Sequence, residues 1–300
     1  MIVFHDDPFT PFDRQPSRES PGPGPGIRRS VEVPAAYVPH SSEAARLRVG
    51  ARPLDPAQWV SPRDADWAPT IAMKRALVAG RPHEVVACLD GAQEACDEAA
   101  AGVLASVGEP PTTETGIDAL VDAALRVADD LCLLLPGPHG APVLSAAVLC
   151  SPNRWRLAEK LGGTMAAVHE PVARYDTDLD SPVNAMLARL SAERPVWRVN
   201  WGLSNHPSLF QPEVPPVTPA MDIAGMWFRV EWQTLRRLPV TGAVQFTIRT
   251  FTESLADFVT RDQAVVHDFA DLVAKIPENV AAYKSIAPYR ERVFDWLSSR

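Results

Sequence analysis

Polar side chains recur at alternate positions along two segments of this 300-residue chain. Arg198 and Asn200 lie in one segment, and Glu231 and Gln233 lie in the other. If both segments are strands, each pair lies on one face, because the side chains of a strand alternate with period two. The four groups could then converge on one cavity, where Glu231 attracts a protonated amine or relays protons. The other interpretation is a solvated sheet surface whose charges pair with one another.

The segment that contains Glu231 predicts a β-hairpin. Residues 227–251 hold two alternating runs that flank a short turn with proline and glycine. The face opposite the polar one predicts a core, and it consists of Met226, Phe228, Val230 and Trp232.

The other periodicities place this hairpin in an α+β fold. Three more strands are predicted at 130–135, 143–150 and 196–203. Helices are predicted at 64–107, with the longer part at 84–107, and at 116–124, 154–161, 180–190 and 255–297. Most strands are joined as hairpins, so we expect an antiparallel sheet flanked by helices. Residues 1–50 are rich in proline and predict a poorly packed arm, which leaves 51–300 as a single domain.

Composition restricts the compartment and the partners. The four cysteines show no C-x-x-C spacing, which predicts buried thiols in a reducing compartment. No uncharged apolar stretch approaches the ~18 to 20 residues that a membrane span needs, so we expect no membrane partner and a cytoplasmic location. The net charge of −8 argues against nucleic acid as a partner, because nucleic-acid binders usually present a basic surface. Small molecules and proteins are the expected partners.

Short motifs in a fixed order resemble one known family. The phrase E-x-Q-T-L-R-R-L-P begins at Glu231, and G-A-V-x-F-T-I-R-T begins at Gly242. Further matches are D-L-C-L-L from Asp130, S-P-N-R-W from Ser151, E-K-L-G from Glu159, H-E-P-V from His169, V-W-R-V-N-W from Val196, and Y-K from Tyr283. Together they resemble the haem-dependent oxidative N-demethylase family, alpha-subunit-like, over residues 51–289. Trp232 stands where that family usually has arginine, and its indole either reshapes the pocket or packs in the core.

This resemblance implies a fold and a reaction. The fold would be a PAS-like haem-binding domain with extra helices at both ends. The reaction would be an oxidative N-demethylation or a related oxidation of an amine substrate, with haem b and O2, and the oxidised product would collapse to an amine and an aldehyde. The sequence carries no flavin, iron–sulfur or NADPH motif, so the electrons would come from a partner protein, an NAD(P)H-dependent reductase.

A haem needs an axial ligand, partners for its propionates and an apolar slot. His169 lies in a matched motif and is the predicted iron ligand, with His206 and His267 as fallbacks. Thiolate ligation by Cys132 or Cys150 is disfavoured, because a buried thiol in apolar surroundings stays protonated.

The propionates need cationic partners. Arg198, Arg249 and Lys160 are the candidates, since a guanidinium or an ammonium group suits a carboxylate. Trp201 completes the predicted cofactor-binding residues.

Two other functions remain open at this stage. A haem-binding PAS-type gas or redox sensor without turnover would carry an output domain or a coiled-coil linker, and the 300 residues show neither pattern. A scaffold subunit that has lost its cofactor would have lost the histidine motif, which is intact here.

Overall fold

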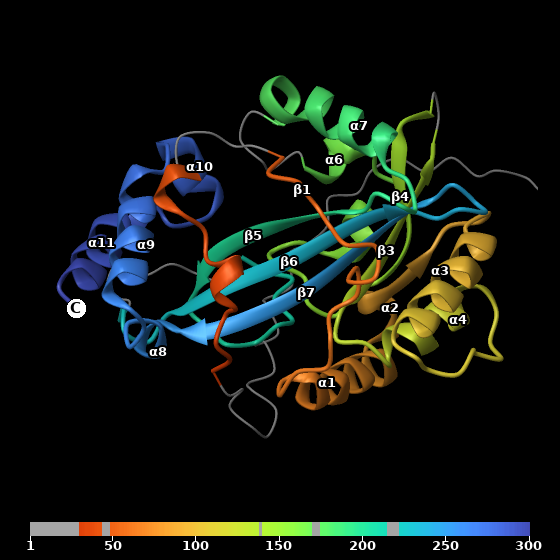
Figure 1. The fold of residues 1–300 in the computed structure, drawn as a ribbon, viewed down its shortest axis with the longest axis horizontal. Helices are drawn as coiled ribbons and strands as arrows, with labels where there is room; N and C mark the ends of the chain where they lie inside the picture. Colours follow the sequence, from red (N-terminus) through yellow and green to blue (C-terminus); the bar gives the residue numbers. More distant parts are fainter. Residues whose placement is uncertain (1–29, 44–48, 138–139, 170–174, 215–221) are drawn as a thin grey trace, which may run out of the picture.

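One seven-stranded antiparallel sheet organises the computed structural model, which describes residues 30–43, 49–137, 140–169, 175–214 and 222–300 (Figure 1). The strand order is β1-β5-β6-β7-β3-β4-β2. The strands are β1 (Arg52–Pro53), β2 (Val86–Cys88), β3 (Asp130–Pro136), β4 (Pro142–Val148), β5 (Val196–Ser204), β6 (Trp227–Arg237) and β7 (Val244–Ser254). β6 and β7 are the longest, and they form the predicted hairpin in a continuous antiparallel register from Trp227↔Ser254 to Arg237↔Val244.

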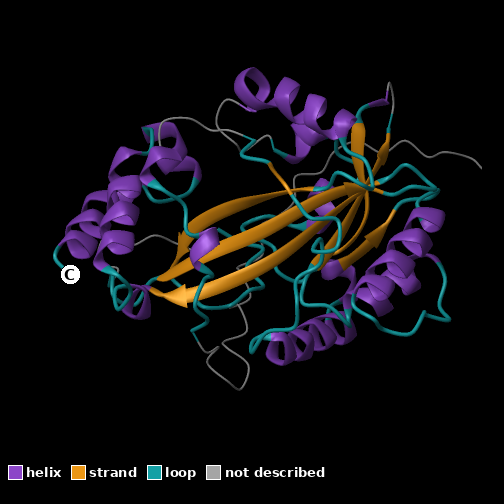
Figure 2. Cartoon of the chain, viewed as in Figure 1, coloured by secondary structure: helices purple, strands orange, loops and turns teal. Residues whose placement is uncertain are grey.

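Helices surround this sheet. They are α1 (Trp67–Gly80), α2 (Pro82–Val85), α3 (Gln93–Ser106), α4 (Gly116–Ala124), α5 (Leu157–Lys160), α6 (Met165–Val168), α7 (Asp180–Arg189), α8 (Leu255–Phe258), α9 (Gln263–Lys275), α10 (Glu278–Tyr283) and α11 (Arg290–Ser298). Figure 2 shows the strands as one layer, with α6 and α7 on one side and α9 to α11 gathered at one end of β5 to β7. No helix in the described part of the chain combines the length and the apolar character that crossing a membrane requires.

The five predicted strands are confirmed, and so is the α+β class. The long helix predicted from residue 84 is wrong at its start, because residues 86–88 form the edge strand β2 on β4 and α3 begins only at Gln93. Gly91 lies between the two elements at φ 85°, a left-handed conformation that glycine adopts without steric cost. The PAS-like arrangement stays a prediction.

The two faces of the sheet have different coverings. On one face, α9 and α11 pack on even-numbered residues of β6 such as Phe228, while α3 and α4 pack on Leu131 and Leu133 of β3. The other face presents odd-numbered residues of β6 and even-numbered residues of β3 and β7 to α5, α6 and α7, among them Cys132 and Ile248. The second face carries the candidate site.

Part of the proline-rich arm packs on the sheet. The backbone N–H of Val31 donates to the Thr252 carbonyl at 2.9 Å, and Val33 is fully buried. The ring of Tyr37 stacks on Trp232 at 5.8 Å between centroids. Residues 31–37 therefore lie against β6 and β7 on the face that α9 and α11 cover, which is the back of the sheet. Residues 1–29 lie outside the described part.

Candidate functional site

The pairing of β5 with β6 brings the predicted polar side chains together. Arg198 lies opposite Gln233, and Asn200 lies opposite Glu231. Side chains directly opposite one another in an antiparallel pair lie on the same face with Cβ atoms ~5 Å apart. All four residues line one cavity of about 230 Å³, and His169 lines it as well. The sheet therefore assembles the predicted row around a single space.

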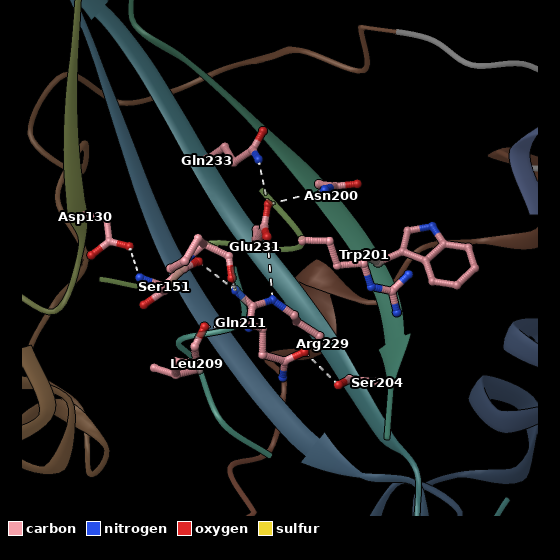
Figure 3. A network of polar contacts seen from close by, with 12 residues as sticks. Asp130, Ser151, Asn200, Trp201, Ser204, Leu209, Gln211, Arg229, Glu231 and Gln233 are labelled. Carbon is pink, nitrogen blue, oxygen red and sulfur yellow. Dashed lines mark hydrogen bonds and ion pairs between the residues drawn. The ribbon is translucent and has the colours of Figure 1, made fainter. Parts of the chain in front are cut away.

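Glu231 is the centre of a buried hydrogen-bond network (Figure 3). Its Oε2 accepts hydrogen bonds from Gln233 Nε2 at 3.0 Å and from Asn200 Nδ2 at 3.2 Å. Its Oε1 lies 3.6 Å from Arg229 Nε. A buried carboxylate needs such partners, because an isolated buried charge is unfavourable. The two amides and the guanidinium thus hold Glu231 in one orientation.

Arg229 anchors this network to the neighbouring loops. Its Nη2 donates to the Ser151 carbonyl at 2.7 Å, and its Nη1 donates to the Leu209 carbonyl at 3.0 Å. Asp130 accepts the backbone N–H of Ser151 at 2.7 Å, and burial raises the pKa of this aspartate (Figure 3). The loop after β4 is therefore tied to β3 and β6 together.

His169 is held as a neutral ring at the C-terminal end of α6. Thr164 caps the start of that helix, since its hydroxyl accepts the Ala167 N–H. The Nδ1 atom of His169 lies 2.8 Å from the Met165 carbonyl, and the ring stacks on Tyr175 at 4.7 Å between centroids. Burial is the main cause that lowers the pKa of His169. With a proton on Nδ1, the lone pair is on Nε2, the arrangement that a metal-binding histidine needs. Glu170, Pro171 and Val172 of the same motif lie outside the described residues.

Apolar side chains form the remaining walls of the main cavity. They come from β3, β4, β7, α6 and α7, and they include Leu134, Leu144, Met165, Leu187, Phe246 and Ile248. Cys132 also lines the cavity, and burial raises its pKa well above the ordinary value, so it is a thiol at neutral pH. Burial likewise raises the pKa of Cys150 to about 12. Thiolate ligation stays disfavoured, because burial keeps both thiols protonated.

Lys284, just past α10, is a site residue to which the sequence assigned no role. Its Nζ donates to the Trp201 carbonyl at 2.6 Å and to Asn200 Oδ1 at 3.3 Å. Burial, and after it the charge of Arg198, lowers the pKa of Lys284 to about 7. The Y-K motif contains this lysine, but nothing in a local pattern shows that the C-terminal helices return to β5.

A second cavity of about 210 Å³ adjoins the first. The residues that line both are Asn153, Trp155, Asn200, Tyr283 and Lys284. Arg154 lines only the second cavity and has a positive φ of 64°, which is uncommon for a residue other than glycine. Its Nη1 donates to the Lys284 carbonyl and its Nη2 to the Leu203 carbonyl, both at 2.8 Å. The S-P-N-R-W motif therefore positions the segment that carries Lys284.

Three of the predicted cofactor residues lie away from the main cavity. Arg249 is on the opposite face of the sheet, where its Nη2 pairs with Asp64 at 2.9 Å and Asp66 at 3.3 Å. Lys160 donates from Nζ to the Ala167 carbonyl at 3.2 Å and does not line the cavity. Trp201 also lies on the opposite face, edge-on to Phe269, and reaches only the second cavity.

Trp232 and the two fallback histidines also lie outside the main cavity. Trp232 packs in the core on the back of β6, so its indole does not enter the main cavity. His206 and His267 are exposed and do not line it either. Of the predicted histidine candidates, His169 alone contributes to the cavity lining among the described residues.

A comparison with protein families gives a match over most of this region. The family model described as haem-dependent oxidative N-demethylase, alpha subunit-like, matches residues 106–294, which is more than half of the chain. The matched range contains β3 to β7, His169, the polar row and Lys284.

Proposed function

We propose that this protein oxidises an N-methylated amine with haem b held in the main cavity, because the chain belongs to the haem-dependent oxidative N-demethylase family of alpha-subunit-like proteins. The reaction would consume O2, take electrons from a separate NAD(P)H-dependent reductase, and release an aldehyde and the demethylated amine. The observation that carries the proposal is the neutral imidazole of His169 beside a polar row in an otherwise apolar cavity.

The donor set of the cavity fits a haem. His169 has Nε2 available as a ligand atom, because its Nδ1 is engaged by the Met165 carbonyl. Apolar walls suit a flat macrocycle, and of the predicted propionate partners Arg198 is the one that lines the cavity. The combined volume of the main and second cavities falls in the lower part of the ~300 to 1,000 Å³ range that is usual for ligand pockets. Arg249, Lys160 and Trp201 are not among the residues that we propose for the cofactor.

When bound, haem b supplies one-electron and dioxygen chemistry. The protein residues have separate tasks. Glu231 attracts the ammonium form of the amine and can take a proton at Oε1, which lies beside Arg229 Nε, while the Asn200 and Gln233 amides fix its Oε2. The apolar walls limit water around these groups, which strengthens each electrostatic interaction. The polar row would therefore orient the amine against the cofactor.

The first experiment is a titration of the purified protein with hemin, followed by absorption in the ferric, ferrous and CO-bound forms. We expect a Soret band with the ferrous–CO behaviour of a histidine ligand, and its loss or shift in His169→Ala. His267→Ala replaces an exposed histidine and is the matched control. A preparation that stays colourless with hemin would contradict the cofactor, and an unchanged spectrum in His169→Ala would contradict the ligand.

The second experiment tests turnover. With a competent reductase and NADH or NADPH, we expect formaldehyde to form from an N-methylated amine in proportion to the haem content. A haem-loaded protein that binds amines but releases no formaldehyde under these conditions would support ligand sensing without turnover.

A further inference from the structure

The two adjoining cavities contain more cationic than anionic side chains. Arg198 and Lys284 line the main cavity, while Arg154, Arg229 and again Lys284 line the second. Glu231 is the one carboxylate among the described residues that line either cavity. Four cations therefore surround one anion in surroundings of low dielectric, where unbalanced charge is unfavourable.

Two of these cations are already engaged by the backbone. Arg154 donates to the Lys284 and Leu203 carbonyls. Arg229 donates to the Ser151 and Leu209 carbonyls and lies beside Glu231. Both contribute positive potential, and each directs both of its Nη groups to backbone carbonyls, whereas no such bond ties Arg198 to a described residue and Lys284 keeps one donor, so these two remain as the cations with donors to offer.

Arg198 has no hydrogen bond or ion pair to any residue that the structure describes, and its Nε is buried without a partner. Burial lowers its pKa, although a guanidinium stays charged at neutral pH. The half-buried guanidinium presents five N–H donors in a planar fork that matches a carboxylate. This side chain is therefore ready to receive an anion.

Lys284 has one donor left. An ammonium group has three N–H bonds, and two of them point to the Trp201 carbonyl and to Asn200 Oδ1. Its Nζ also lies 4.7 Å from the centroid of the Trp201 ring, where a cation is favoured. Repulsion from Arg198 and Arg154 adds to the effect of burial on its pKa. An anion bound next to Lys284 would raise this pKa again, because a neighbouring negative charge favours the ammonium form.

We infer that Arg198 and Lys284 form a subsite for a carboxylate of the bound ligand. Arg198 and Glu231 are diagonal neighbours across β5 and β6, ~7 to 8 Å apart between Cα atoms. A short amino acid fits this spacing, with its ammonium at Glu231 and its carboxylate at Arg198 and Lys284. This inference rests on the proposed function. With the subsite, the substrate would be an N-methylated amino acid and not a simple alkylamine. A haem propionate is the other source of the same carboxylate chemistry.

The first arm compares two probes that differ in a carboxylate. N,N-dimethylglycine differs from trimethylamine in that a carboxylate replaces one hydrogen of a methyl group. Calorimetry on the full-length protein, with and without hemin, should show N,N-dimethylglycine binding at least about tenfold more tightly than trimethylamine. Arg198→Gln and Lys284→Met should each reduce the ratio of the two affinities about tenfold, and Lys284→Arg should retain part of the preference.

Exposed cations provide the controls. Arg156→Gln and Lys275→Met change residues that pair with surface carboxylates outside both cavities, so they should leave the preference intact. Because the haem-free protein is measured too, the subsite is tested even if haem binding or turnover fails. The comparison of the two probes on the unmodified chain needs no variant to fold.

The second arm identifies a propionate. Hemin and hemin dimethyl ester differ in the charge of the two propionates. If the propionate is the source, Arg198→Gln should weaken hemin about tenfold and leave the dimethyl ester unchanged, while the two amine probes bind alike. If Arg198→Gln and Lys284→Met weaken neither the binding of N,N-dimethylglycine nor the binding of hemin, the subsite does not exist.

Discussion

Glu231 is the residue whose chemistry can be separated most cleanly from its structural role. Glutamine has nearly the same shape, so Glu231→Gln removes the charge without opening a cavity. Loss of a group that attracts an amine and accepts a proton should lower formaldehyde release by about 10²-fold or more. Hemin binding should persist, because the walls and His169 are unchanged. The measurement is the initial rate at saturating reductase.

A matched control exists for this change. Glu159→Gln replaces a glutamate that is mostly exposed, and its rate should equal that of the unmodified protein. Equal rates in Glu231→Gln and Glu159→Gln would contradict the proposed role.

Lys284 makes the stability of the protein depend on pH. Its pKa is about 7 in the folded protein and ordinary, 10.5, in the unfolded chain, so the unfolded state binds more protons between these values. The free energy of unfolding therefore rises with pH across this window, by up to about 1.4 kcal/mol per pH unit. Below pH 7 both states are protonated, and the unfavourable burial of the charge is fully present.

Lys284→Met should remove this dependence. In urea unfolding, any stability advantage of the variant over the unmodified protein should be largest below pH 7 and should shrink as pH rises toward 10. The charged groups that face Lys284, which are Arg198, Arg154 and Glu231, are present in both proteins, so the difference between the two proteins reports on Lys284. A difference that stays constant with pH would show that Lys284 keeps its ordinary pKa.

At the scale of elements, Arg154 joins the loop after β4 to the end of α10 and to β5. Arg154→Ala and Arg154→Gly lose the same two hydrogen bonds. Glycine also relieves the positive φ of 64°, which costs other residues roughly 1 to 2 kcal/mol. We expect both variants to be less stable than the unmodified protein. In chemical unfolding, the free energy of unfolding of the alanine variant should be about 1 kcal/mol below that of the glycine variant. Equal stabilities would mean that the backbone is not strained at this position.

The sheet elements were predictable because their periodicity is strong. Residues 227–251 alternate so regularly that the hairpin, its apolar face and the polar row follow from period two alone. The short edge strands β1 and β2 were not predictable, since two or three residues show no period. β2 in particular follows the helical residues 82–85 directly, and only its pairing with β4 makes it a strand.

The site was predictable as far as one strand pair reaches. Arg198, Asn200, Glu231 and Gln233 meet because alternation and one register bring them together. Arg249 shows the limit of that reasoning, because it lies one residue out of phase with Thr250, the β7 partner of Glu231, and so points to the other face. Lys284 and Arg154 depend on contacts between segments far apart in the chain, which no local pattern contains.

At the scale of the whole molecule, Arg249 links α1 to the back of the sheet. It is fully buried, pairs with Asp64 and Asp66, and lies 3.4 Å from Thr70 Oγ1. Arg249→Met leaves the buried Asp66 without this cation, and such a loss typically costs about 3 to 5 kcal/mol. Urea unfolding should show this loss, while hemin affinity per folded molecule should not change, because the residue faces away from the cavity.

The same helix provides a comparison. Arg75→Met changes an exposed residue of α1 and should alter stability by no more than about 0.5 kcal/mol. A weakened affinity for hemin in Arg249→Met, but not in Arg75→Met, would place Arg249 back among the cofactor residues.

The order of the strands also bears on how the protein behaves at high concentration. In the described part of the chain, the sheet ends on one side at β1, which has two residues including Pro53, and on the other at β2, which has three. The long strands β6 and β7 have both neighbours in place. β1 covers β5 only at Val196 and Trp197, so the outer edge of β5 over residues 198–204 has no strand beside it among the described residues. The side chains of Lys284 and Arg154 donate to the Trp201 and Leu203 carbonyls there, so an incoming chain that adds a strand to this edge must first displace two half-buried cations.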